Sequence, residues 1–257
     1  MKKIFTAIAL FSGTITFSQT ICCAKPTDAF AMLTKDKNFV TAHDEPLPFT
    51  LQSPKGKDIS FKTEDGKPGY AYEVGDATNK NVIFVIHEWW GLNDYIKQES
   101  ERIAGETGAR VIALDLYDKK IATTRDSASK YMGQVKTGRA TDIIRGAIKY
   151  VGSDAKIATI GWCFGGGWSM QASLLAGKQA KACVIYYGMP EDNLQKLTTL
   201  NAPVLFVFAQ KDEWINKEVV QKFEVKMKEA GKDVVIKSYD ADHAFANPSN
   251  PLSEKLL

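Results

Sequence analysis

The sequence predicts an α/β protein with a doubly wound, mostly parallel sheet and helices on both faces. The first observation is a series of short, continuous apolar runs rich in Val and Ile, typical of strands buried on both faces of a parallel sheet. The second is that helix-like segments separate these runs, and such alternation gives parallel sheets with right-handed crossovers. The runs span residues 81–87, 109–116, 156–162, 181–188, 202–209 and 233–240, and the helix-like segments about 94–107, 126–150, 164–177 and 216–230.

An antiparallel hairpin is expected ahead of these runs. Residues 59–75 form two alternating stretches around the turn sequence DGKPG, which is typical of a hairpin at a sheet edge. We expect the α/β domain to span residues 56–257. Residues 25–55 are polar, contain proline and have few apolar positions, which predicts a linker leading into the domain.

The first residues have the composition of a secretory signal peptide. Two lysines precede an apolar stretch, residues 4–17, that is too short for a secure membrane span, and small residues follow up to Ala24. We therefore predict a signal peptide over residues 1–24 and export to the periplasm or out of the cell. A lipoprotein signal is less favoured, because Ile21 is bulkier than the residue usually found before a lipidated cysteine.

The charge balance argues against nucleic acid or an anionic membrane as a partner. The net charge of the whole chain is +3, and two of the lysines lie in the leader, so the mature chain is close to neutral. We expect no stable membrane insertion once the leader is removed. A monomer is the default expectation, because nothing in the sequence determines an oligomeric state.

A Gly-x-Cys-x-Gly motif follows the predicted strand at 156–162. It reads GWCFG, with Cys163 between Gly161 and Gly165, and matches a nucleophile elbow, in which a tight turn from strand to helix exposes the nucleophile above the sheet. The glycines are needed because side chains there would collide with neighbouring backbone. The N-terminus of the following helix is expected to lower the pKa of the thiol. The alternative is a Gly-rich turn around an inert buried cysteine.

Two further residues follow strands in the chain order that a catalytic triad on this fold requires. Asp212 comes after the run at 202–209, and His243 after the run at 233–240. We expect His243 to take the thiol proton and Asp212 to orient the imidazole. Alternatively, Asp212 is a solvated loop charge and His243 pairs with a neighbouring aspartate. His87 is a second candidate base.

The segment HEWWGLND, residues 87–94, follows the first parallel strand. The loop at this position and the residue after the nucleophile supply the two backbone N–H groups of an oxyanion hole, which assigns Trp89 and Phe164 as donors. Glu88 is interpreted as a tuning group that restrains Cys163 until substrate binds. The alternative for Glu88 is a loop carboxylate facing water.

With these residues assembled, the chain from about Ile59 onward resembles the dienelactone hydrolase family of α/β-hydrolases. The resemblance rests on HEWWGLN, ALDLY at 113–117, GWCFGG, QKDEWI and DHAFANP. It implies a carboxymethylenebutenolidase-like hydrolase that cleaves small esters or lactones through a thioester on Cys163, with no cofactor or metal.

Three features depart from the family pattern. Where relatives are expected to hold a substrate carboxylate with arginine, this chain has Lys119 or Lys120 and Asn247, and lysine lacks the bidentate fork of arginine. Relatives are expected in the cytosol, whereas this chain carries a predicted leader. The family also has a final helix, of which residues 253–257 would be only the beginning.

Two rival functions remain open at this point. The same triad could cleave thioesters or peptides. Alternatively, an exported binding or redox protein could have kept the fold without turnover, with Cys163 and Cys183 paired as a disulfide in an oxidising compartment.

Overall fold

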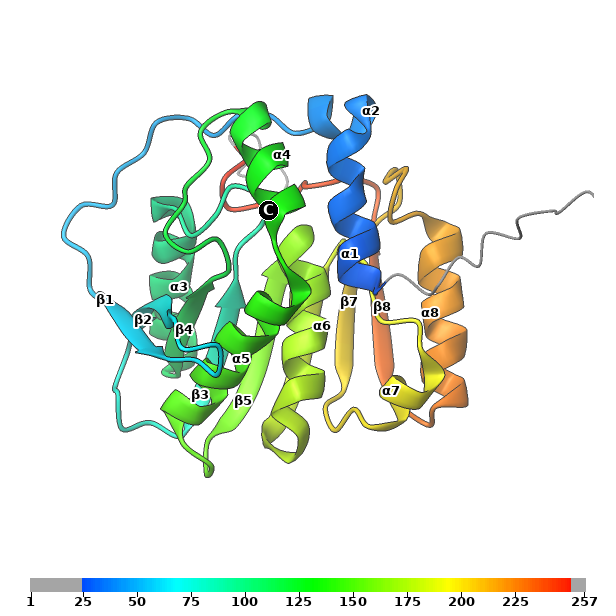
Figure 1. Cartoon of the computed structure of the whole chain (residues 1–257). Helices are drawn as coiled ribbons and strands as arrows, with labels where there is room; N and C mark the ends of the chain where they lie inside the picture. Colours follow the sequence, from blue (N-terminus) through cyan, green and yellow to red (C-terminus); the bar gives the residue numbers. More distant parts are fainter. Residues whose placement is uncertain (1–24, 251–257) are drawn as a thin grey trace, which may run out of the picture.

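The computed structural model describes residues 25–250, which form an eight-stranded sheet flanked by helices (Figure 1). The strand order is β1-β2-β4-β3-β5-β6-β7-β8. The β1–β2 and β2–β4 pairs are antiparallel and all other pairs are parallel, which confirms the predicted fold class and the hairpin at the sheet edge. The strands are β1 (Lys57–Lys62), β2 (Pro68–Val74), β3 (Asn81–Ile86), β4 (Arg110–Asp115), β5 (Lys156–Trp162), β6 (Ala180–Tyr186), β7 (Val204–Ala209) and β8 (Val234–Tyr239).

Helices cover both faces of this sheet. The chain moves from β3 to β4 in one direction and from β4 to β5 in the other, so right-handed crossovers place α3 on one face and α5 on the opposite face. The strands between them are apolar on both sides, and every residue of β4 is buried. The helices of the domain are α3 (Asp94–Thr107), α4 (Arg125–Gln134), α5 (Thr137–Val151), α6 (Phe164–Ala176), α7 (Leu194–Thr198) and α8 (Lys217–Glu229), with a 3-10 turn, η2 (Gly177–Gln179).

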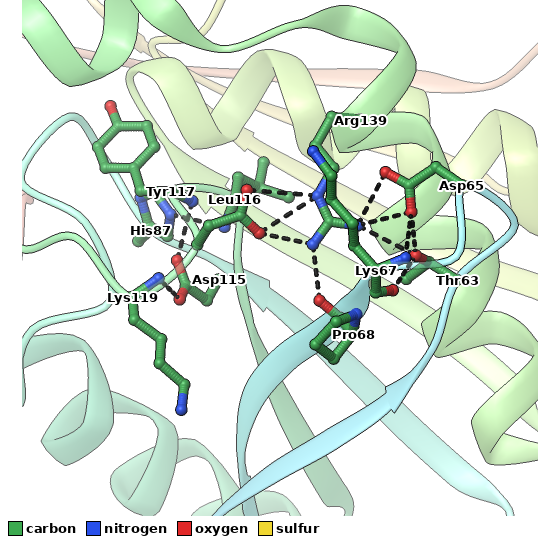
Figure 2. Close-up of polar contacts among 11 residues, drawn as sticks. Thr63, Asp65, Lys67, Pro68, His87, Asp115, Leu116, Tyr117, Lys119 and Arg139 are labelled. Carbon is green, nitrogen blue, oxygen red and sulfur yellow. Dashed lines mark hydrogen bonds and ion pairs between the residues drawn. The ribbon is translucent and has the colours of Figure 1, made fainter.

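Arg139 of α5 ties the hairpin to the loop after β4. Its guanidinium donates to the Asp65 carboxylate in the hairpin turn, to the Pro68 carbonyl at the start of β2, and to Asp118 beyond β4 (Figure 2). The Asp115 carboxylate at the end of β4 accepts from the amides of Tyr117 and Lys119. Charged hydrogen bonds from the Arg139 guanidinium and to the Asp115 carboxylate therefore fix the loop after β4.

The predicted linker differs from what the structure contains. Its first half forms α1 (Pro26–Ala31), a 3-10 turn η1 (Met32–Lys35) and α2 (Lys37–Thr41). We call residues 26–43 the N-terminal cover. Helix α1 packs on α6, and η1 and α2 pack on α4 (Figure 1). Phe30, Phe39 and His43 are almost fully buried, so the cover belongs to the domain.

The reason for this difference is the shortness of the helices, which leaves no room for a 3.6-residue apolar repeat. Two local signals are nevertheless present. Pro26 occupies the first helical position of α1, and the Asp36 carboxylate caps α2 by accepting from the amides of Asn38 and Phe39. Residues 44–56 lack helix and strand, as expected for a connecting segment.

Two predictions fall on residues outside the described range: the signal peptide at 1–24 and the start of a final helix at 253–257. At the sheet edge, Val235 and Tyr239 of β8 are about half exposed. No helix within residues 25–250 is both long enough and apolar enough to cross a membrane.

Candidate active site

Cys163 lies in a strained turn between β5 and α6. Its backbone has φ 54° and ψ −117°, a conformation that costs free energy for a residue with a side chain and is held only by its surroundings. A Cβ on Gly161 would lie 2.2 Å from the Gly165 carbonyl oxygen, and a Cβ on Gly165 would lie 2.2 Å from the Ile86 carbonyl oxygen. The glycines are therefore required by close backbone approach, and the structure has the predicted elbow.

The structure brings Cys163, His243 and Asp212 together. His243 Nε2 lies 3.2 Å from Cys163 Sγ, and His243 Nδ1 lies 2.5 Å from Asp212 Oδ2. The other carboxylate oxygen of Asp212 accepts from the amides of Trp214 and Ile215, each at 2.9 Å, which fixes the carboxylate. All three side chains are buried. The alternatives for Asp212 and His243 do not hold, because Asp212 is buried and the carboxylate that pairs with His243 Nδ1 is that of Asp212.

The electrostatics of the site favour a neutral thiol when no substrate is bound. Burial raises the pKa of Cys163 well above its usual value and the Phe164 backbone N–H opposes this, while Glu88, when it is ionised, and the Asp212 carboxylate raise it further. The expected lowering by the helix N-terminus is therefore present but smaller than the cost of burial. Burial also acts to raise the pKa of Asp212, but His243 and the two backbone amides outweigh it and hold that pKa below its usual value.

The two predicted oxyanion donors lie on the segments that follow β3 and β5. Phe164 is the first residue of α6, and its N–H interacts with Cys163. Trp89 is fully buried in the loop after β3, where its carbonyl accepts from the Tyr117 hydroxyl at 3.2 Å. Within residues 25–250, the Trp89 N–H donates to no protein acceptor. The role of these two amides as oxyanion donors stays a prediction.

Glu88 does not face water. It is fully buried: its Oε1 accepts from the Ser249 hydroxyl and its Oε2 from the Trp90 amide, each at 2.6 Å. Burial raises its pKa from 4.5 to about 8, against the opposing effect of these two hydrogen bonds. At neutral pH the Glu88 carboxyl is therefore mainly uncharged.

Ser249 was missed by the sequence interpretation. It joins the loop after β8, which carries His243, to the loop after β3: its hydroxyl also accepts from Asn93 Nδ2 at 3.0 Å. Asn247, which the sequence predicted as a substrate-binding residue, supports this connection between the two loops, because its Oδ1 accepts from the Ser249 amide at 2.9 Å. Asn247 is buried and its contacts are structural.

Lys119 is turned away from the triad. Its φ of 68° follows a φ of 51° at Asp118, and these two left-handed residues direct the lysine toward β2, where its ammonium lies 4.2 Å from the centre of the Tyr70 ring. It lines a pocket of about 360 Å³ together with Asp58 and Lys97, and none of the triad residues reaches that pocket. Lys120 lies in the same pocket. The expected substrate-binding role of Lys119 at the triad therefore lacks geometric support.

His87 is occupied by backbone contacts. Its Nε2 accepts from the Leu116 amide at 3.1 Å (Figure 2). Its Nδ1 lies 2.6 Å from the Glu88 carbonyl oxygen. Burial lowers its pKa to about 4. His87 therefore anchors the loop after β3 to the end of β4 and is not available as the base.

A second imidazole reaches the sulfur from the N-terminal cover. His43 Nε2 lies 3.7 Å from Cys163 Sγ, and His43 Nδ1 lies 2.7 Å from the Phe39 carbonyl oxygen. The sequence interpretation missed His43 because it lay in the predicted linker.

The aromatic ring of Phe39, in the N-terminal cover, helps to close the site over Cys163. The Phe39 ring packs against Trp214, His243 and Trp89 at centroid distances of 5.2, 5.7 and 5.9 Å. Cys163 has no exposed surface. A surface pocket of about 720 Å³ beside α2 has His243 among its lining residues. The sulfur is therefore closed to solvent in this structure, and the N-terminal cover forms part of the closure.

Cys163 and Cys183 are both free and buried. Cys183 belongs to β6 and lies 3.8 Å from the Ser169 hydroxyl. The disulfide expected by the redox alternative is therefore absent from the described structure.

Comparison with known proteins was made by sequence and by structure. The family model described as "Dienelactone hydrolase family" matches residues 68–255. Protein usf of Aquifex pyrophilus is 31% identical over 177 residues, covering 64% of this chain and 76% of that protein. The carboxymethylenebutenolidase of a Pseudomonas species, strain P51, is 27% identical over 184 residues, covering 66% and 76%. An esterase structure from Pyrococcus furiosus superposes with a TM-score of 0.60 at 17% identity, covering 79% of this chain and 92% of that one, which is a likeness of fold.

Proposed function

We propose that this chain, which belongs to the dienelactone hydrolase family, hydrolyses small carboxylic esters or lactones through a thioester on Cys163. The observation that carries the proposal is the hydrogen-bonded series from Cys163 Sγ to His243 at 3.2 Å and from His243 to Asp212 at 2.5 Å. A relative with 27% identity is a carboxymethylenebutenolidase, which agrees with this reaction class.

Acylation begins when His243 Nε2 accepts the thiol proton and the sulfur attacks the carbonyl carbon of the ester. The new C–S bond forms as the carbonyl electrons move to oxygen, and the amides of Phe164 and Trp89 donate to that oxyanion. The intermediate then expels the alcohol, which takes the proton from the His243 imidazolium. In a lactone, the alcohol stays attached as the other end of the opened ring.

Deacylation repeats these steps with water as the nucleophile. His243 accepts a proton from water, hydroxide adds to the thioester carbonyl, and collapse releases the carboxylic acid and returns the proton to sulfur. The Asp212 carboxylate keeps the proton of His243 on Nδ1 and stabilises the imidazolium in both halves of the cycle.

In this proposal, Glu88 influences the ionisation of the Cys163 thiol. While its carboxyl is neutral, it does not oppose thiolate formation, and when it ionises it raises the pKa of the Cys163 thiol. The tuning role of Glu88 stays a prediction, in which the carboxyl restrains Cys163 only when it is ionised, above about pH 8.

The substrate class follows from what surrounds the triad. Arginine is absent from the positions where a substrate carboxylate would be held, Lys119 faces another pocket and Asn247 is used within its own loop. The rings of Phe39, Trp89 and Trp214 pack on the two imidazoles that lie beside the sulfur. We therefore favour small, uncharged esters and lactones over dicarboxylate-like dienelactones. Export to the periplasm remains part of the proposal, and cell fractionation of the full-length chain tests it.

The test is turnover of p-nitrophenyl acetate and of a simple γ-lactone by the wild type, Cys163→Ala and Cys183→Ala. Both cysteines are buried, so the second variant controls for the loss of a buried thiol. We expect Cys163→Ala to lose hydrolysis of both substrates and Cys183→Ala to keep it. Equal activity of all three proteins would refute the proposal. Faster cleavage of a thioester or a peptide than of every ester would reassign the substrate.

A further inference from the structure

Two imidazoles and a thiol meet at one point in the site, although the proposed reaction uses only one of the imidazoles. His43 Nε2, Cys163 Sγ and His243 Nε2 all lie within 4.8 Å of one another, and all three side chains are buried. His43 comes from the N-terminal cover, so the cluster exists only while the cover is in place.

The hydrogen bonds at the far side of each ring fix which nitrogens carry protons. His43 Nδ1 lies 2.7 Å from the Phe39 carbonyl oxygen and His243 Nδ1 lies 2.5 Å from the Asp212 carboxylate. Both partners can only accept, so each neutral imidazole carries its proton on Nδ1 and directs the Nε2 lone pair toward Cys163. The thiol has one proton and can satisfy one of these two acceptors.

We propose that His43, Cys163 and His243 form a three-ligand site for Zn²⁺, and that occupation of this site reversibly blocks the nucleophile. Thiolate and imidazole are the ligands that zinc prefers, at bond lengths of about 2.3 and about 2.05 Å. In a tetrahedral site these lengths correspond to S···N separations of about 3.6 Å. The observed separations from Sγ are 3.2 Å to His243 and 3.7 Å to His43, which lie on either side of that value.

The outer contacts match what zinc-binding histidines have. A metal-bound imidazole usually donates its other N–H to a carboxylate or a backbone carbonyl, which orients the ring and raises its basicity. His243 has the carboxylate partner and His43 the carbonyl partner. Zinc binding would displace the thiol proton to solvent and leave both Nδ1 protons in place, with no change of oxidation state. Three protein ligands leave one tetrahedral position for water.

A purely structural role for His43 is the competing explanation, since its ring also packs on Trp89 at a centroid distance of 4.3 Å. Packing alone predicts no binding of a cation. The proposal goes beyond ester hydrolysis and describes an inhibitor of that activity, so binding is measured without substrate.

The experiment is isothermal titration of metal-free full-length protein with Zn²⁺, repeated with Cd²⁺ to record the ultraviolet charge-transfer band of a cadmium thiolate. The variants are Cys163→Ala, His43→Phe, which keeps an aromatic ring against Trp89, and His43→Gln as a second variant in case the first does not fold. Cys183→Ser is the control. Titration in two buffers with different ionisation heats counts the protons released.

We expect one zinc ion per chain, release of about one proton and a cadmium thiolate band in the wild type and in Cys183→Ser. Cys163→Ala should lose the band, and each folded His43 variant should bind zinc more than about tenfold more weakly, since even changes outside the ligand set cost about that much. Affinity that is unchanged in the His43 variants, or the absence of binding in the wild type, would overturn the proposal. Neither result depends on whether the protein hydrolyses esters.

Discussion

Replacement of the buried Glu88 carboxyl by an amide should change how the stability of the protein depends on pH. Glu88→Gln keeps an oxygen for the Trp90 amide and a polar group facing Ser249, but it removes the titrating proton. Because burial raises the pKa of Glu88 from 4.5 to about 8, the folded chain holds a proton that the unfolded chain has already lost between these two values.

The sign and size follow from proton linkage. Between about pH 4.5 and pH 8 the folded state binds the extra proton, so the free energy of unfolding falls by about 1.4 kcal/mol per pH unit as pH rises. The stabilising contribution is fully present below pH 4.5 and is lost by about pH 8, for a total of roughly 3 to 5 kcal/mol. Above that pH the carboxyl is ionised in both states and the loss is complete.

The measurement is urea unfolding followed by tryptophan fluorescence at about pH 5, 7 and 9, at constant ionic strength. His43 and His87, whose pKa values burial lowers to about 3 and about 4, titrate equally in both proteins and cancel in the difference. Glu64→Gln, at an exposed position, is the matched control. Glu88→Gln should gain stability relative to the wild type as pH rises. Parallel pH profiles would refute the assignment of a neutral buried carboxyl.

Three further outcomes are expected from single substitutions. Asp212→Asn should lower kcat for ester hydrolysis by about 10³- to 10⁴-fold, because the His243 tautomer is no longer fixed. Asp242→Asn, at an exposed position, should leave kcat unchanged, and equal effects of the two substitutions would contradict the triad. Gly165→Ala should destabilise the fold by about 3 kcal/mol in the same urea assay, because the added Cβ would lie 2.2 Å from a backbone oxygen. Gly105→Ala, where an added Cβ has no neighbour within 4 Å, should stabilise the fold slightly. Phe39→Ala should weaken docking of the N-terminal cover by about 3 to 5 kcal/mol and speed alkylation of Cys163 by iodoacetamide. Met32→Ala, at an exposed position of the cover, should do neither. Unchanged alkylation in Phe39→Ala would show that the cover does not limit access to the sulfur.

The sequence predicted the parallel sheet because strands buried on both faces leave continuous apolar runs, and all six runs became strands. The juxtaposition of Cys163, Asp212 and His243 was predictable because each follows a parallel strand, and the carboxyl ends of such strands share one edge. The elbow was recognisable from glycine spacing alone, which reflects contacts with neighbouring backbone.

Other features depended on information that local patterns do not carry. His43 meets Cys163 across 120 positions of sequence, from helices too short to show a periodic apolar face. The direction of Lys119 depends on two successive residues with positive φ, and neither is glycine. The neutral state of Glu88 depends on complete burial beside Ser249, which only the packed loops create. Each of these is a tertiary effect imposed on an ordinary local sequence.

If Cys163 is the nucleophile, its sulfur becomes acylated during turnover, and rapid acid quenching during hydrolysis of p-nitrophenyl acetate captures that intermediate. Peptide mass spectrometry of the quenched protein should find one acetyl group, carried as a thioester by the peptide that contains Cys163, and the Cys163→Ala variant should carry none. Steady turnover with an unmodified Cys163, or an acetyl group on a different residue that survives in Cys163→Ala, would contradict the account.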